Sequence, residues 1–262
     1  MQTTNYQALK IIDKNQSKID DVLVVEAPLQ ININSEAYTV VMRTPNDDVE
    51  LIRGLLFAED IYKNVINFET EVIEEKEDFS AIINVKIPKE NLGYLNKRTL
   101  LSVSSCGICG KKELQDIQVS GKKIDVESSF SAQEIEGMYS KMKKSQVTFQ
   151  NSGGSHAAAI FDKNQQLLTI KEDIGRHNAV DKTVGELLLK NQLKKANYLL
   201  VSGRVSYEIV SKAFIARVPI IIAVSACSSL AVDFAKEFGI CLVGFSRGNK
   251  MTVYSNPSYI RA

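Results

Sequence analysis

The stretch at residues 198–226, YLLVSGRVSYEIVSKAFIARVPIIIAVSA, decides the fold class. Two short apolar runs, 198–201 and 219–224, flank a segment, 206–217, with the apolar spacing of a helix. A helix that joins two consecutive buried strands is typical of parallel strands in an α/β sheet. This stretch therefore predicts a layered α/β domain.

The alternation of expected strands and helices continues on both sides of that stretch. Residues 157–162 and 166–174 resemble paired strands, a helix is expected over 178–192, and a further helix and strand over 229–239 and 240–245. We therefore expect an α/β domain with a mixed, largely parallel sheet over residues 131–262. Ser131 and Glu134 form the S-x-x-E pattern of a capping box, which predicts that a helix opens this domain.

The first part of the chain has a different pattern. Strand-like runs cover 22–34 and 37–44, a helix is expected over 49–60, and an acidic hairpin with a solvated face over 68–87. We expect a smaller α+β domain over 1–95 and a connecting segment over 96–130.

The overall composition is that of an ordinary globular chain. Of 262 residues, 44% are hydrophobic and 24% charged, and the formal net charge is +1. This balance gives no reason to expect a nucleic-acid partner. The sequence shows no membrane-spanning stretch and no signal-peptide core, and four cysteines in such a chain favour reduced thiols. A cytoplasmic location is expected.

Polar turns follow each strand of the second half. If the strands are parallel, these turns meet at the carboxyl edge of the sheet, where α/β proteins bind ligands. Glycines allow close backbone approach, and arginines favour anions. We therefore expect a site for a phosphorylated, nucleotide-like ligand. The turn after 198–201 supplies Ser202, Gly203 and Arg204, and the turn after 240–243 supplies Gly244, Arg247, Gly248 and Lys250.

The chain has only two histidines, His156 and His177. A single histidine is more often a local hydrogen-bonding residue than a functional one. His177, between Arg176 and Asn178 at a strand-to-helix junction, is the better candidate for contact with the ligand. His156 follows two glycines and could lie beside it.

Cys106 and Cys109 form a CxxC pair within SVSSCGICG, residues 102–110. Zinc would need further ligands, but Cys227 and Cys241 have no ligand neighbours at the usual spacing. The flanking serines and glycines predict a flexible loop rather than the strand-to-helix position of a thioredoxin-like pair. A thiol that receives and passes on sulfur is the third possibility, because Lys111 and Lys112 could lower its pKa.

Several motifs in the same order resemble the FdhD family of formate dehydrogenase accessory sulfurtransferases. They are SSCGICG, GGSHAAAIF, EDIGRHNAVDKTVGELL, SGRVSYEIVSKAFIARVPIIIAVSA and VGFSRGNKMTVY. The resemblance implies that the second half has a cytidine-deaminase-like fold. It also implies a homodimer. One departure from the family pattern is Cys227, which stands where proline is often found and leaves a third thiol near the expected ligand edge.

The resemblance implies a sulfur carrier that accepts sulfur from a cysteine desulfurase. On this basis Cys106 bears the persulfide, Cys109 is its partner, and residues 245–250 bind bis(molybdopterin guanine dinucleotide), which a guanine nucleotide could mimic. The sulfur would pass to that cofactor before its insertion into formate dehydrogenase. The alternatives are a non-catalytic chaperone that binds the cofactor and an enzyme that uses zinc or a redox dithiol.

Overall fold

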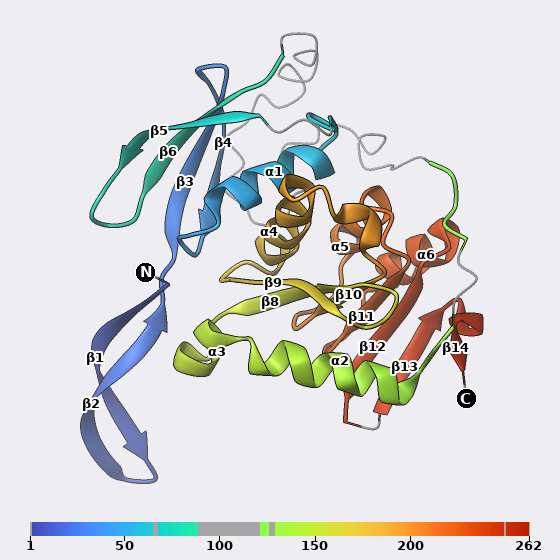
Figure 1. Ribbon diagram of the computed structural model, residues 1–262. Helices are drawn as coiled ribbons and strands as arrows, with labels where there is room; N and C mark the ends of the chain where they lie inside the picture. Colours follow the sequence, from blue (N-terminus) through green and yellow to red (C-terminus); the bar gives the residue numbers. More distant parts are fainter. Residues whose placement is uncertain (1, 65–67, 89–120, 126–128, 249, 262) are drawn as a thin grey trace.

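The computed structural model describes residues 2–64, 68–88, 121–125, 129–248 and 250–261 (Figure 1). Within them, a six-stranded sheet with helices on both faces forms the larger part of the molecule. A four-stranded sheet with one helix lies beside it, and a two-stranded ribbon projects at the N-terminus.

The main sheet has the strand order β13-β12-β11-β10-β8-β9. Its strands are β8 (His156–Phe161), β9 (Leu167–Asp173), β10 (Tyr198–Val201), β11 (Ile220–Ala223), β12 (Cys241–Arg247) and β13 (Lys250–Ser255). Strands β10, β11 and β12 are parallel neighbours, whereas the pairs β8–β10, β8–β9 and β12–β13 are antiparallel. The sheet is therefore mixed, as expected, and β9, β10, β11 and β12 all end at the same edge.

Helices cover both faces of this sheet because alternate strand residues point to opposite sides. One face packs against α4 (Arg176–Leu189), α5 (Tyr207–Ile215) and α6 (Ser229–Phe238). The other packs against α2 (Ala132–Lys144), which lies below the sheet in Figure 1. In β10, for example, Leu199 and Val201 face the three helices, while Tyr198 and Leu200 face α2.

The capping box expected at Ser131 is confirmed. The Ser131 hydroxyl accepts from the Glu134 amide, and the Glu134 carboxylate accepts from the Ser131 amide. Short elements complete this part: α3 (Val147–Ser152), two 3-10 turns at Leu193–Lys195 and Pro257–Tyr259, and the parallel pair β7 (Phe130–Ser131) and β14 (Ile260–Arg261).

The four-stranded sheet has the order β4-β3-β6-β5. Its strands are β3 (Ala27–Ile33), β4 (Glu36–Arg43), β5 (Glu69–Glu75) and β6 (Ala81–Lys86), and α1 (Asp48–Ala58) covers its apolar face. Every residue of β5 is exposed, which confirms the solvated acidic hairpin. The expected strand over 22–34 is two strands: it divides at Val25–Glu26, and its first part belongs to the ribbon of β1 (Thr3–Ile12) and β2 (Asn15–Val24).

Two glycines allow α1 and α4 to pack backbone against backbone. A Cβ atom on Gly54 would lie 2.0 Å from the carbonyl oxygen of Asp181, and one on Gly185 would lie 1.8 Å from that of Glu50. No side chain fits at either position, so the helix of the smaller sheet is held directly on a helix of the larger one.

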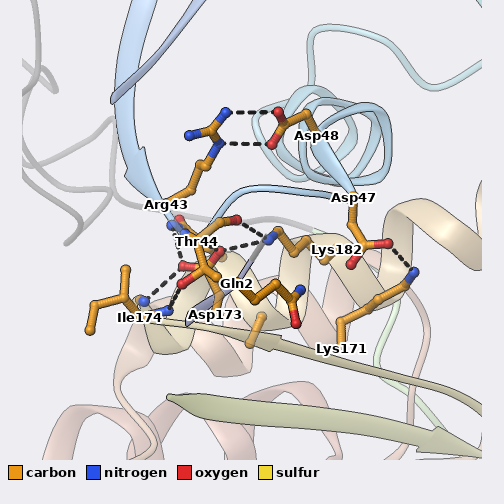
Figure 2. Close-up of polar contacts among 12 residues, drawn as sticks. Gln2, Arg43, Thr44, Asp47, Asp48, Lys171, Asp173, Ile174 and Lys182 are labelled. Atoms are coloured by element: carbon orange, nitrogen blue, oxygen red, sulfur yellow. Dashed lines mark hydrogen bonds and ion pairs between the residues drawn. The ribbon is translucent and has the colours of Figure 1, made fainter. Parts of the chain in front are cut away.

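Buried polar contacts join the same two parts, as Figure 2 shows. The Asp173 carboxylate accepts from the Thr44 amide at 3.1 Å and pairs with the Lys182 ammonium at 2.8 Å; Lys182 also donates to the Thr44 carbonyl at 2.7 Å. All three residues are 0% exposed. We call Thr44, Asp173 and Lys182 the interface hub.

Asp47, the N-cap residue of α1, makes no side-chain cap. Its carboxylate binds Lys171 of β9 at 2.6 Å instead, also visible in Figure 2. Burial alone would lower the pKa of Lys171, but Asp47, Glu186 and Glu50 outweigh it and raise that pKa. The ion pair is therefore another tie between the smaller sheet and the main sheet.

Candidate functional site

Four strand ends meet at one edge of the main sheet. The Val205 amide donates to the Ala226 carbonyl at 3.0 Å, the Phe245 amide donates to the Ser225 carbonyl at 3.0 Å, and β8 begins beside the end of β10. We call the turns 174–176, 202–206 and 224–228, together with residues 245–248 and 250, the carboxyl edge. The structure thus brings together the turns that the sequence placed there, with Asn249 outside the described residues.

Strands β12 and β13 form a β-hairpin, in which Arg247 pairs with Lys250. Phe245 and Gly248 have positive φ angles of 51° and 55°, and the Phe245 side chain is 50% exposed. The Arg247 Nε donates to the Val224 carbonyl at 3.2 Å, which ties the hairpin to the end of β11. Ser246 is buried, so its neighbours Phe245 and Arg247 are the ones presented to a ligand.

The turn after β10 lies close to His156 and Arg176. A Cβ on Gly203 would be 3.2 Å from the Nδ1 of His156 and 3.3 Å from the Cβ of Arg176, so glycine allows this approach. The Ser202 hydroxyl accepts from the Ala157 amide at 2.9 Å, and the Arg204 side chain is exposed.

His156 stands among cations at this edge. Burial, and then Arg176 and Arg204, lower its pKa, while Asp173 opposes the shift. Its imidazole is therefore neutral near pH 7 and can accept or donate a hydrogen bond without adding charge. The sequence pattern favoured His177 over His156 as a ligand contact, yet His156 lies at the carboxyl edge, beside Gly203.

His177, expected to contact the ligand, is buried in the first turn of α4 and is only 4% exposed. Its Nε2 lies 3.0 Å from the Ser206 hydroxyl, and its Nδ1 lies 3.3 Å from a carboxylate oxygen of Glu208. Both ring nitrogens thus face α5 and the residue before it. Ser206 and Glu208 were not predicted; their only signal was a serine and an acid at the start of an expected helix.

Several groups at the edge suit an anion. The N-caps of α4 and α5, Gly175 and Ser206, make no side-chain cap, so neither supplies a side-chain acceptor for the first amides of its helix. The Nε of Arg176 is buried without a hydrogen-bond partner among the described residues. These donors fit phosphate groups.

The two described cysteines are held as thiols. Burial raises the pKa of Cys227 to about 11 and that of Cys241 to about 12. Cys227 does lie at the edge, where its Sγ would be 3.0 Å from a Cβ on Gly244. Cys106 and Cys109 lie outside the described residues. Within the described part of the chain, no three His, Cys, Asp or Glu side chains gather as a metal site.

The fold and this site define a mixed α/β protein with a basic, glycine-containing edge. No helix in the described ranges is long and apolar enough to cross a membrane. The chain belongs to the FdhD/NarQ family, which it matches over residues 24–261.

Relatives and a solved structure agree with that assignment. The chain is 40% identical to the sulfur carrier protein FdhD of Saccharolobus solfataricus, with 97% of each chain covered. It is 40% identical to the protein of the same name from Picrophilus torridus, with 95% of this chain and 96% of the relative covered. Its fold matches the crystal structure of a protein described as a formate dehydrogenase accessory protein from Desulfotalea psychrophila, with a TM-score of 0.80, 22% identity and complete coverage of both chains.

Proposed function

We propose that this protein is a sulfur carrier for formate dehydrogenase. Family membership supports the general role, and the observation that carries the ligand proposal is the cationic carboxyl edge. Arg204 and Arg247 are exposed there, and Arg176 holds a buried nitrogen without an acceptor among the described residues. Phosphates of a guanine-nucleotide-bearing molybdenum cofactor would supply the missing negative charge.

In this proposal Cys106 carries the sulfur as a persulfide received from a cysteine desulfurase. The thiolate of Cys109 then attacks the inner sulfur of that persulfide, and the terminal sulfur leaves towards the bound bis(molybdopterin guanine dinucleotide). The high pKa values of Cys227 and Cys241 support this division of roles, because a protonated buried thiol is a poor nucleophile.

The test is intact-mass spectrometry after incubation with a cysteine desulfurase and cysteine. The wild-type chain should gain the mass of one sulfur atom, Cys106→Ala should not, and Cys227→Ser should behave as wild type. Loss of the adduct in Cys227→Ser but not in Cys106→Ala would contradict the assignment.

A chaperone that only binds the cofactor is the second candidate. The observation that favours it is the cationic carboxyl edge itself, because Arg176, Arg204 and Arg247 could bind an anionic cofactor whether or not sulfur is transferred. If this candidate is correct, Cys106→Ala should retain full formate dehydrogenase activity in cells lacking the native protein. The sulfur-carrier proposal expects that activity to be lost.

A further inference from the structure

Ser206, His177 and Glu208 stand in the order of a serine–histidine–acid array. The Ser206 Oγ lies 3.0 Å from the His177 Nε2, and the His177 Nδ1 lies 3.3 Å from the Glu208 Oε2. When His177 is protonated, the Glu208 carboxylate forms an ion pair with Nδ1 that stabilises the imidazolium, while Nε2 faces the hydroxyl and can exchange a proton with it.

The Ser206 hydroxyl is not used as a helix cap. Three helices of the main domain begin after a serine, and two of these serines cap in the usual way: Ser131 accepts from the Glu134 amide and Ser228 from the Ala231 amide. Ser206 makes no such bond, although a serine at this position normally stabilises its helix by capping. Its oxygen lies within hydrogen-bond distance of the His177 Nε2 instead.

A buried ion pair holds the acid of this array in place. Lys212, one turn after Glu208 on α5, lies 3.8 Å from the Glu208 Oε1 and binds the Asp181 carboxylate at 2.7 and 2.9 Å. Burial alone would lower the pKa of Lys212, but Asp181, Glu208 and Glu59 outweigh it and raise that pKa. Lys212 therefore stays protonated, and its ammonium lies near Oε1 of Glu208, while His177 contacts Oε2.

The array meets the carboxyl edge at Ser206. His177 is 4% exposed, whereas Ser206 is partly exposed and follows Arg204 and Val205 in the turn after β10. We infer that Ser206, His177 and Glu208 form a proton relay that serves the ligand bound at this edge. Ser206 is the residue that exchanges a proton with the reacting sulfur. His177 orients the Ser206 hydroxyl and returns a proton to it, and Glu208 orients His177.

The relay deepens the proposed function and rests on it. When a thiolate attacks the inner sulfur of a persulfide anion, a disulfide forms and the terminal sulfur leaves with the electron pair of the broken S–S bond. That sulfur needs one proton to depart as hydrosulfide rather than as the doubly charged sulfide. Ser206 gives its hydroxyl proton and recovers one from the Nε2 of an imidazolium His177, while Glu208 stays a carboxylate.

The experiment separates loading of sulfur from its release. Protein is loaded with cysteine desulfurase and cysteine, freed of donor, and followed for sulfide release above a Cys109→Ala blank with GDP present. Ser206→Ala should load as wild type but release sulfide about 10²-fold more slowly, the usual size of a general acid–base contribution. Ser131→Ala is the matched control: it should unfold at a lower urea concentration because its helix cap is lost, and keep the wild-type release rate.

The pH profile distinguishes a relay from a merely structural hydrogen bond. Release by wild type should change with pH through one ionisation, and Ser206→Ala and His177→Gln should both lose that dependence. Glu208 of α5 contacts His177 directly, and Arg176 precedes His177 on α4. Behind Glu208, Lys212 pairs with Asp181 of α4, and Glu59, which follows α1, acts on both members of that pair.

A spectroscopic measurement covers the case in which His177→Gln does not fold. With only two histidines in the chain, ring-nitrogen NMR resolves His177, and Ser206→Ala should shift its Nε2 signal without moving that of Nδ1. Normal loading with a wild-type release rate in Ser206→Ala would overturn the relay alone. Absence of loading in the wild-type chain would overturn the proposed function and the relay with it.

Discussion

Two groups of charged side chains lie at the same end of the main sheet and differ in whether each charge is paired with an opposite one. In the interface hub, Asp173 and Lys182 neutralise each other and are 0% exposed. At the carboxyl edge, Arg204 and Arg247 are exposed and form no ion pair with any described residue. A buried charge costs free energy unless it is paired, whereas an exposed cation remains available to a ligand. The hub therefore holds the two sheets together, and the edge is left to bind.

The strongest test of this contrast removes the acid of the hub. Asp173→Ala leaves the Lys182 ammonium buried without its carboxylate, so the free energy of unfolding should fall by about 3–5 kcal/mol. Glu71→Ala is the control, because Glu71 and Lys86 form an exposed pair at 3.6 Å worth at most about 1 kcal/mol. Urea unfolding measures both. Equal losses would contradict a special role for the hub.

The next largest effect is expected where α1 crosses α4. Gly185→Ala places a methyl group against the Glu50 carbonyl and should destabilise the chain by about 1–3 kcal/mol, because the helices must separate. Gly137→Ala provides the comparison within α2, where a Cβ meets nothing within 4 Å; it should stabilise the chain by about 0.4–1 kcal/mol. Thermal unfolding of the two variants should shift in opposite directions.

The carboxyl edge should respond in binding rather than in stability. Arg204→Ala should weaken binding of GDP about tenfold, since one charge-assisted hydrogen bond contributes about 1.5–3 kcal/mol and exposure reduces it. Its unfolding free energy should stay within about 0.5 kcal/mol of wild type. Isothermal titration calorimetry with Lys163→Ala, a change in the exposed turn between β8 and β9, supplies the control. Unchanged affinity in Arg204→Ala would remove that arginine from the site.

The smallest effect concerns His156, whose pKa is lowered in the folded state by burial and by Arg176 and Arg204. As pH falls through the unfolded-state value of about 6.5, the unfolded chain binds more protons than the folded one, so stability decreases. His156→Gln should reduce the loss of stability between about pH 7.5 and 5.5 relative to wild type. Identical pH dependence in the two proteins would show that the edge does not suppress protonation of His156.

Local patterns predicted the elements well where a single segment contained the whole signal. Ser131 and Glu134 form the capping box of α2 within one turn, and the unbroken apolar runs at 198–201 and 219–224 mark strands buried on both faces. The run 22–34 was wrongly expected to be one strand, because a strand-like pattern does not show which strand each residue pairs with. Residues on either side of Val25–Glu26 pair with different strands in different sheets.

The sequence by itself determined the α/β class, the strand ends that carry polar turns, and the cations placed there. Only the tertiary structure decided which of those charged groups are paired with a partner of opposite charge. Asp173 and His177 lie in the same short segment, yet Asp173 pairs with Lys182 and accepts from the Thr44 amide, and His177 turns inward to Ser206 and Glu208. Thr44 lies 129 residues from Asp173 and Ser206 lies 29 residues from His177, and contacts over such separations follow from packing that no local spacing encodes.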